Sequence, residues 1–292
     1  MDTPPRPGRN TLRLVCAADH IRHAKPFGDD QTYAHLIWSQ LALPRSTCDQ
    51  VREFERVCGD AWLHVRAGAV AVDGRRIAAA IPSGSYARLI LRMIDSHLLR
   101  NPGNNVPTGS SAWKWLDALG CAQSKSARDR ASRAMMATAA AEITFGFGST
   151  TKYCRVIREV ADWRTREDGL CWPTELRVSA DYAADLRDGR AYPLDTRAML
   201  GLCSKSALAM DLYTWLAYRL PRAKPGGETI SWVAVQVQFG GPDSASDSVG
   251  SWRRYVRKQL QAVRSVYPDA LVDLVPGGLK LRRSRPPVPF KL

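Results

Sequence analysis

The chain has 292 residues, enough for two ordinary hydrophobic cores, and its 45% hydrophobic and 24% charged content excludes wholesale disorder. Its 42 Lys and Arg against 28 Asp and Glu give a formal net charge of +14. We therefore expect a polyanionic partner, which means DNA, RNA or an anionic membrane face, with a merely basic and soluble surface as the alternative. Seven scattered cysteines, no export signal and no apolar run near ~18 residues predict a cytoplasmic protein that spans no membrane.

The first predicted elements follow a loose tail, which we assign to residues 1–28 because its start is rich in Pro and Arg. Apolar spacing over residues 31–43 predicts a short helix, and a Ser or Thr at 46–47 could cap a second helix that reaches about Cys58. The pair Asp73-Gly74 between two apolar runs predicts a β-hairpin, because both central positions of such a turn need a positive φ.

Helical spacing returns over residues 85–100 and again, in a shorter segment, over 112–119. An Ala-rich basic helix begins after Gly120, and residues 143–147 then alternate as a strand. Helix, short helix, basic helix and strand in this order outline a winged helix-turn-helix. We therefore assign residues 29–160 to a first winged-helix domain that provides dimerisation and DNA backbone contacts.

The remaining chain predicts a linker and a second domain of the same kind. Residues 161–194 are punctuated by Gly and Pro and are interpreted as a linker with short elements, and residues 195–292 as a second winged-helix domain for sequence-specific DNA binding. Apolar alternation over 233–239 predicts a strand by its period alone. A strongly amphipathic helix follows over 249–267, and a hairpin turns at Pro276-Gly277-Gly278.

The helix predicted over 249–267 carries basic residues opposite its apolar stripe. An arginine there can bridge O6 and N7 of guanine in the major groove, while the other cations neutralise phosphates. A solvated charged face is the alternative, but few acids lie between these cations and a basic hairpin follows. The predicted DNA-contacting residues of this helix are Arg253, Arg254, Arg257, Lys258, Gln261 and Arg264.

Two further basic segments are predicted to contact DNA. The second arm of the C-terminal hairpin would be a wing on the backbone or minor groove, although a charged arm can also serve to protect a sheet edge. The Ala-rich helix would bind phosphates of the DNA backbone. Alternatively, its basic side chains would pair with acidic residues of a partner subunit. These residues are Lys280, Arg282 and Arg283 in the hairpin and Lys125, Arg128 and Arg133 in the helix.

Catalytic motifs are weak throughout the sequence. There is no G-x-x-x-x-G-K-[ST] loop for a nucleotide, and no His-x-His pair of the kind that a metal-dependent nickase would need. No acid cluster near His20 and His23 indicates a metal site, and there is no close C-x-x-C pair. We therefore predict a protein that is not an enzyme and needs neither metal nor cofactor, with a DNA nicking or relaxing enzyme kept as an alternative.

Several strings resemble RepA-type plasmid replication initiators. Four segments occur in the same order as in that family and are similar to it in sequence: IPSGSYARLILRMIDSHLLR, DLYTWLAYRL, the pattern SW-x-x-x-x-x-QFG and GLKLRRSRPPV. The resemblance spans about residues 36–289. SKSARDRASRAMMATAAAEI departs from it, because the family has a Gly/Arg/Leu-rich run there. The resemblance implies that residues 232–239 are the first helix of the DNA-reading pair. It also implies that Arg253, Arg254, Arg257 and Lys258 occupy recognition-helix positions.

The sequence therefore predicts an α+β fold of tandem winged helix-turn-helix domains with short β-hairpin wings. The family resemblance implies a plasmid replication initiator that binds repeated duplex DNA sites at an origin. It also implies recruitment of the host replication initiator and helicase machinery, and pairing as a homodimer. A winged-helix transcriptional repressor built from the same parts is the alternative within DNA binding.

Overall fold

The computed structural model describes residues 9–46, 50–121, 123–148, 150–152, 156–166, 169–240 and 249–289. It contains both helices and sheets, which confirms the α+β class. The N-terminal part (residues 9–195) contains α1 (Arg9–His23), β1 (Gln31–His35), α2 (Ile37–Gln40), β2 (Glu53–Cys58), β3 (Ala61–Arg66), β4 (Ala69–Val72), β5 (Arg75–Ala78), α3 (Gly84–Arg100), β6 (Asn105–Pro107), α4 (Ala112–Ala118), α5 (Lys125–Ala140), β7 (Glu142–Phe147), β8 (Thr150–Lys152), β9 (Ile157–Ala161), β10 (Arg164–Thr165), β11 (Cys171–Trp172), β12 (Glu175–Val178), α6 (Ala180–Arg187) and β13 (Ala191–Asp195). The C-terminal part (residues 196–289) contains α7 (Thr196–Cys203), α8 (Ala207–Arg219), β14 (Glu228–Ser231), α9 (Trp232–Phe239), α10 (Val249–Val266), β15 (Val272–Val275) and β16 (Gly278–Leu281).

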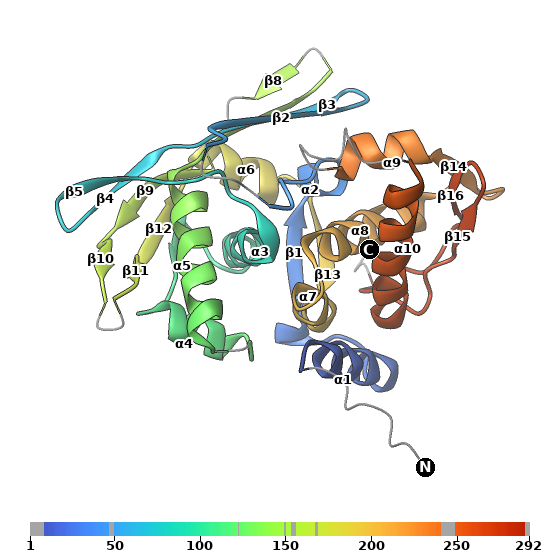
Figure 1. Cartoon of the computed structure of the whole chain (residues 1–292), viewed down its shortest axis with the longest axis horizontal. Coiled ribbons are helices and arrows are strands. Elements are labelled where there is room, and N and C mark those ends of the chain that lie inside the picture. The colour runs from blue at the N-terminus through green and yellow to red at the C-terminus, as the bar shows by residue number, and fades with distance from the viewer. Residues whose placement is uncertain are drawn as a thin grey trace.

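Figure 1 shows most strands of the N-terminal part and helices α3 to α6 on one side of the molecule, and α7 to α10 on the other. The largest sheet has the order β2-β3-β7-β8, and a second has the order β6-β12-β9. In the C-terminal part β14, β16 and β15 form an antiparallel sheet with β16 in the middle. β1 and β13 pair with each other between the two sides.

The hairpin and several of the helices lie where the sequence predicts them. Asp73 and Gly74 join β4 to β5 with φ values of 47° and 76°, as the tight turn requires. The helices predicted over 85–100, 112–119 and after Gly120 are α3, α4 and α5. These elements are confirmed because their apolar period or turn chemistry is local and strong.

Two early helices of the prediction are wrong. Residues 31–43 form strand β1 and the single turn α2, and the segment that ends at Cys58 is strand β2. β2 alternates because Phe54 and Arg56 point inward between exposed neighbours. One of those buried side chains is charged, so apolar spacing did not reveal the period. Of the two predicted caps of that helix, Thr47 lies outside the described residues.

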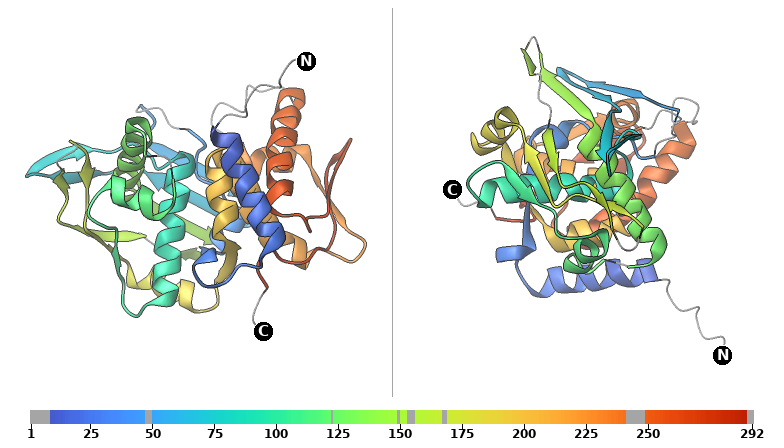
Figure 2. Two further views of the ribbon diagram at one scale, coloured as in Figure 1. Left: turned by 90° about the horizontal axis from the view of Figure 1, so that it is seen from below. Right: turned by 90° about the vertical axis from the view of Figure 1, so that its left-hand side faces the viewer.

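Residues 9–23, inside the segment expected to be loose, form helix α1 instead. α1 lies along α7 and α10 of the C-terminal part (Figure 2). It buries Leu14, Ala17 and Ala18 there. The Cβ of Ala17 comes so close to Gly201 of α7 that a Cβ at that glycine would lie 2.9 Å from it. The helix is thus stabilised by a partner far along the chain, which composition does not show.

The segment expected to be a linker, residues 161–194, is built into the core instead. Its strand β12 lies in the middle of a sheet, and α6 buries Tyr182 and Leu186 completely. Trp172 is also fully buried. β13 then pairs with β1 across the register from Gln31↔Asp195 to His35↔Ala191. Gly169 and Gly189 lie between these short packed elements with a positive φ, whereas Pro193 lies within β13.

In the C-terminal part the strand predicted over 233–239 is helix α9, as the family resemblance implies. The Ser231 side chain caps it by accepting a hydrogen bond from the backbone N–H of Ala234, at 3.1 Å. Its buried residues include Trp232, Val235 and Phe239, which are spaced by three and four. The helices predicted before and after it are α7, α8 and α10, and the predicted hairpin is β15–β16.

A buried polar network surrounds His35 where β1 meets α6. The imidazole Nδ1 accepts a hydrogen bond from the Ile37 N–H, so the ring proton lies on Nε2, 3.0 Å from the Asp185 carboxylate. The backbone N–H of His35 donates to the Asp95 carboxylate, which also accepts from the Tyr182 hydroxyl. Burial lowers the pKa of His35 below its usual 6.5, although both carboxylates oppose this and Arg92 reinforces it.

The lowered pKa of His35 predicts a loss of stability in mild acid. Above pH 6.5 the His35 ring is neutral in both the folded and the unfolded chain. Below pH 6.5 the ring takes up a proton in the unfolded chain but stays neutral in the folded chain until its lower pKa is reached. The free energy of unfolding should fall by up to about 1.4 kcal/mol per pH unit for this one proton. Urea unfolding at pH 7.5, 6.5 and 5.5 measures it. His35→Gln should flatten the slope and the exposed His20→Gln should not, whereas equal slopes would exclude His35 as the cause.

Candidate nucleic-acid interface

Helix α10 presents a continuous basic face to solvent. Its 18 residues bury one stripe that contains Trp252, Val256 and Leu260. With 3.6 residues per turn, the opposite face consists of exposed residues. Their side chains make no hydrogen bond or ion pair within the part of the chain that the structure describes. These residues are Arg254, Arg257, Lys258 and Gln261.

The other two predicted helix residues, Arg253 and Arg264, tie α10 to the hairpin that follows it. The Arg253 guanidinium donates to the Pro276 carbonyl at 2.8 Å and lies over the Trp232 ring, 5.3 Å from its centroid. The Arg264 guanidinium donates to the Val272 carbonyl. These contacts fix the hairpin along one flank of the basic face, so both arginines position the surface in the free protein.

The hairpin residues predicted to contact DNA differ in what holds them. Lys280 points outward from the central strand β16, while its neighbours Leu279 and Leu281 are fully buried. Arg282 forms an ion pair with Asp273 of β15 at 2.7 Å, which partly compensates its charge. Arg283 is exposed. Lys280 and Arg283 are therefore the better placed of the three for a phosphate.

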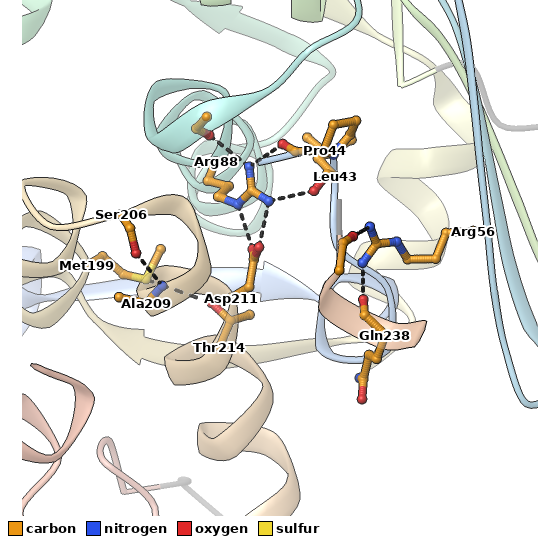
Figure 3. Close-up of polar contacts among 12 residues, drawn as sticks. Leu43, Pro44, Arg56, Arg88, Met199, Ser206, Ala209, Asp211, Thr214 and Gln238 are labelled. Atoms are coloured by element: carbon orange, nitrogen blue, oxygen red, sulfur yellow. Dashed lines mark hydrogen bonds and ion pairs between the residues drawn. The ribbon is translucent and has the colours of Figure 1, made fainter. Parts of the chain in front are cut away.

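Contacts from the N-terminal part hold the end of α9, the helix that precedes α10 (Figure 3). The guanidinium of Arg56, on β2, donates to the carbonyls of Gln238 and Gly240. Burial lowers the pKa of Arg56 to about 10, which leaves it protonated at neutral pH. A cation at the C-terminal end of a helix stabilises the helix dipole. In return, the Gln238 side chain donates to the Gln40 carbonyl at 2.9 Å.

A buried ion pair joins α3 to α8 beside this contact (Figure 3). Arg88 donates from Nε and Nη2 to the two carboxylate oxygens of Asp211, both at 2.6 Å, and also donates to the carbonyls of Leu43, Pro44 and Gly84. At the start of α8, the Ser206 hydroxyl donates to the Gln259 side chain of α10 at 2.7 Å. The orientation of α10 is thus set partly from the N-terminal part.

The basic helix α5 brings only some of its predicted residues toward α10. Arg133 is exposed and lines a cavity of about 650 Å³, together with Tyr255 of α10. Lys125 is exposed and Arg128 partly buried, and neither lines that cavity. Arg130, which belongs to the same predicted basic helix, and Arg45 also line it. No sequence pattern marks Arg45.

Neither a metal-ligand cluster nor a membrane-spanning helix is found among the described residues. No group of three or more His, Cys, Asp or Glu side chains there is arranged to hold a metal ion. None of the helices in the described ranges is both long enough and apolar enough to cross a bilayer. Burial raises the pKa of Cys203 to about 12 and also raises that of Cys121, which keeps these two thiols protonated at neutral pH.

Comparison with known proteins gives matches among solved structures only. No family model and no curated protein matches the chain. The crystal structure of RctB domains 2-3 (RctB-155-483) is 13% identical and aligns over 78% of this chain and 82% of that one, with a TM-score of 0.47. A selenomethionine derivative of domains 2 and 3 of RctB is also 13% identical and aligns over 85% of this chain and 98% of that one, with a TM-score of 0.49.

Proposed function

We propose that this protein binds duplex DNA by placing α10 in a major groove. The observation that carries the proposal is the exposed face of Arg254, Arg257, Lys258 and Gln261, opposite a fully packed stripe. A helix of this diameter fits the ~12 Å groove, and arginine can read guanine there. The order α8, β14, α9, α10, β15, β16, with β16 central in the sheet, supports a winged helix in this part of the chain.

The role that we propose is that of a plasmid-type replication initiator without catalytic activity. The resemblance of DLYTWLAYRL and its companion strings to RepA-type initiators supports this role, and DLYTWLAYRL now lies on and just after α8. In the proposal, α10 reads repeated sites at an origin. The N-terminal part adds backbone contacts and pairs subunits. The host replication initiator and helicase machinery then assembles on the complex.

A footprint on the DNA that surrounds the protein's own gene tests the proposed role. An initiator of this kind should protect several directly repeated, evenly spaced sites. Protection of a single inverted repeat over a promoter would favour the repressor instead. Cleavage of a supercoiled plasmid that carries the protected region, in the presence of Mg²⁺, would replace the non-catalytic proposal with a nicking enzyme.

Two single variants separate base reading from phosphate contact. Arg257→Ala should weaken binding to a duplex selected from random sequence by about 1–3 kcal/mol and relax the preference at one base pair. Arg283→Ala should weaken all sequences alike, because a phosphate contact carries no base information. Binding to a panel of single-base variants of the selected duplex measures both. Equal, sequence-independent losses of affinity in both variants would mean that α10 contacts the phosphate backbone without recognising bases.

A further inference from the structure

The cavity between α5 and α10 has a positively charged lining. It measures about 650 Å³, within the range of ligand pockets, and lies where the start of α3, the start of α8, α5 and α10 meet. Three arginines line it, namely Arg45, Arg130 and Arg133. No acidic residue lies among the described residues of its wall.

Aromatic rings, not carboxylates, hold two of these arginines. The Arg45 guanidinium lies 5.4 Å from the centroid of the Trp252 ring and 5.2 Å from that of Tyr255, both on α10. Its Nε is buried and has no hydrogen-bond partner among the described residues. Arg130 lies 5.7 Å from the centroid of the Tyr86 ring. A ring face orients a cation but leaves its full charge, so the cavity keeps a strong attraction for an anion.

The start of α3 adds to this field. α3 has 17 residues and begins at Gly84, and its N-cap residue Ser83 makes no side-chain capping hydrogen bond. Both residues line the cavity. The Gly84 N–H donates to the Pro44 carbonyl at 3.3 Å, so the later N–H groups of the first turn carry the partial positive charge that suits a phosphate. The helix start and the three arginines therefore favour the same kind of ligand.

The place of the cavity relative to α10 indicates where such a phosphate comes from. Around α10, Tyr255 lies on one flank of the exposed basic face, and Arg253 and Arg264 lie on the other, next to the hairpin. The cavity and the hairpin thus lie on opposite sides of the face that would enter the groove. A major groove has a sugar–phosphate backbone on each side, so a duplex on α10 presents one backbone to the hairpin and the other to the cavity.

We propose that this cavity is a phosphate-binding site, formed by Arg45, Arg130, Arg133 and the start of α3, that takes a backbone phosphate of the bound duplex. In this form the inference rests on the proposed function. A phosphorylated small molecule, such as a free nucleotide, offers the same chemistry, and the experiment distinguishes the two sources.

The main test compares the salt dependence of DNA binding in two double variants. Arg130→Ala/Arg133→Ala removes two cavity charges, and Arg75→Ala/Arg76→Ala removes two exposed charges from β5, which lies far from α10 in Figure 1. Each lost phosphate contact makes the slope of log K against log[salt] shallower by about 0.9. The cavity variant should therefore lose about one to two units of slope and bind all sequences more weakly, while the control should match the wild type.

A second readout needs no DNA. The melting temperature of the full chain is measured with increasing pyrophosphate and, separately, ATP. A saturable rise that the cavity variant loses and the control keeps, with unchanged DNA slopes, would assign the site to a free phosphorylated ligand. Unchanged slopes together with no such rise would overturn the proposal. If the wild type binds no DNA at all, the proposed function fails, and this second readout still decides whether the cavity binds phosphate.

Discussion

Asp211→Ala should lower the free energy of unfolding by about 3–5 kcal/mol, because it leaves the guanidinium of Arg88 buried without its charge partner. The Arg88 and Asp211 side chains are only 6% and 10% exposed, and the carboxylate accepts two hydrogen bonds at 2.6 Å. The carbonyls of Leu43, Pro44 and Gly84 satisfy other N–H groups of Arg88 but do not neutralise it. Urea unfolding measures the effect.

The matched control for Asp211 is Glu228, which pairs with Arg219 at 2.9 Å with side chains that are 43% (Arg219) and 20% (Glu228) exposed. Glu228→Ala should cost about 0–1 kcal/mol, because water can solvate the arginine that remains. Replacing both buried partners, as in Arg88→Met/Asp211→Leu, should cost less than Asp211→Ala alone. If the two single carboxylate variants are equally stable, the buried pair does not hold the two parts of the chain together.

Raising monovalent salt from about 50 to 200 mM should weaken DNA binding by about 10³- to 10⁴-fold. The exposed cations of α10, the two hairpin residues Lys280 and Arg283, and the cavity arginines could together contact about six to eight phosphates, which gives a slope near −5 to −7. Titration of a fluorescent duplex at several salt concentrations measures the slope, and a neutral solute at equal osmolality is the control. A slope shallower than about −2 would leave these surfaces without a role in DNA binding.

Elements with a strong local signal could be predicted from the sequence. The stripe of α10 repeats over five turns, and the turn at Asp73-Gly74 requires a positive φ at both residues. α9 could not be predicted from its period. Val233 and Val237 are exposed and Val235 is buried, so the apolar alternation that predicts a strand includes valines on the solvent face of the helix. The capping hydroxyl of Ser231 is the local sign that favours the helix.

Residues whose role depends on distant partners could not be predicted. Arg45 matters only because α10 brings Trp252 and Tyr255 beside it. The sequence alone predicts that Arg56 is an exposed cation. It is buried because α9 ends against β2. The spacing of basic residues correctly predicted that one face of α10 is exposed to solvent. It could not show that Arg253 and Arg264 are engaged by the carbonyls of the following hairpin.

The packing of α1 on α7 and α10 has a consequence for how the chain folds during synthesis. α1 leaves the ribosome more than 200 residues before α10 does. β1 is likewise synthesised long before β13, the strand with which it pairs. Until then the apolar side chains of α1, such as Leu14, have no surface to cover them. Contacts so distant in sequence slow folding and leave intermediates open to aggregation. Expression at lower temperature or with chaperones should therefore raise the soluble yield, and removing residues 1–23 should expose the apolar surfaces of α7 and α10 that α1 covers.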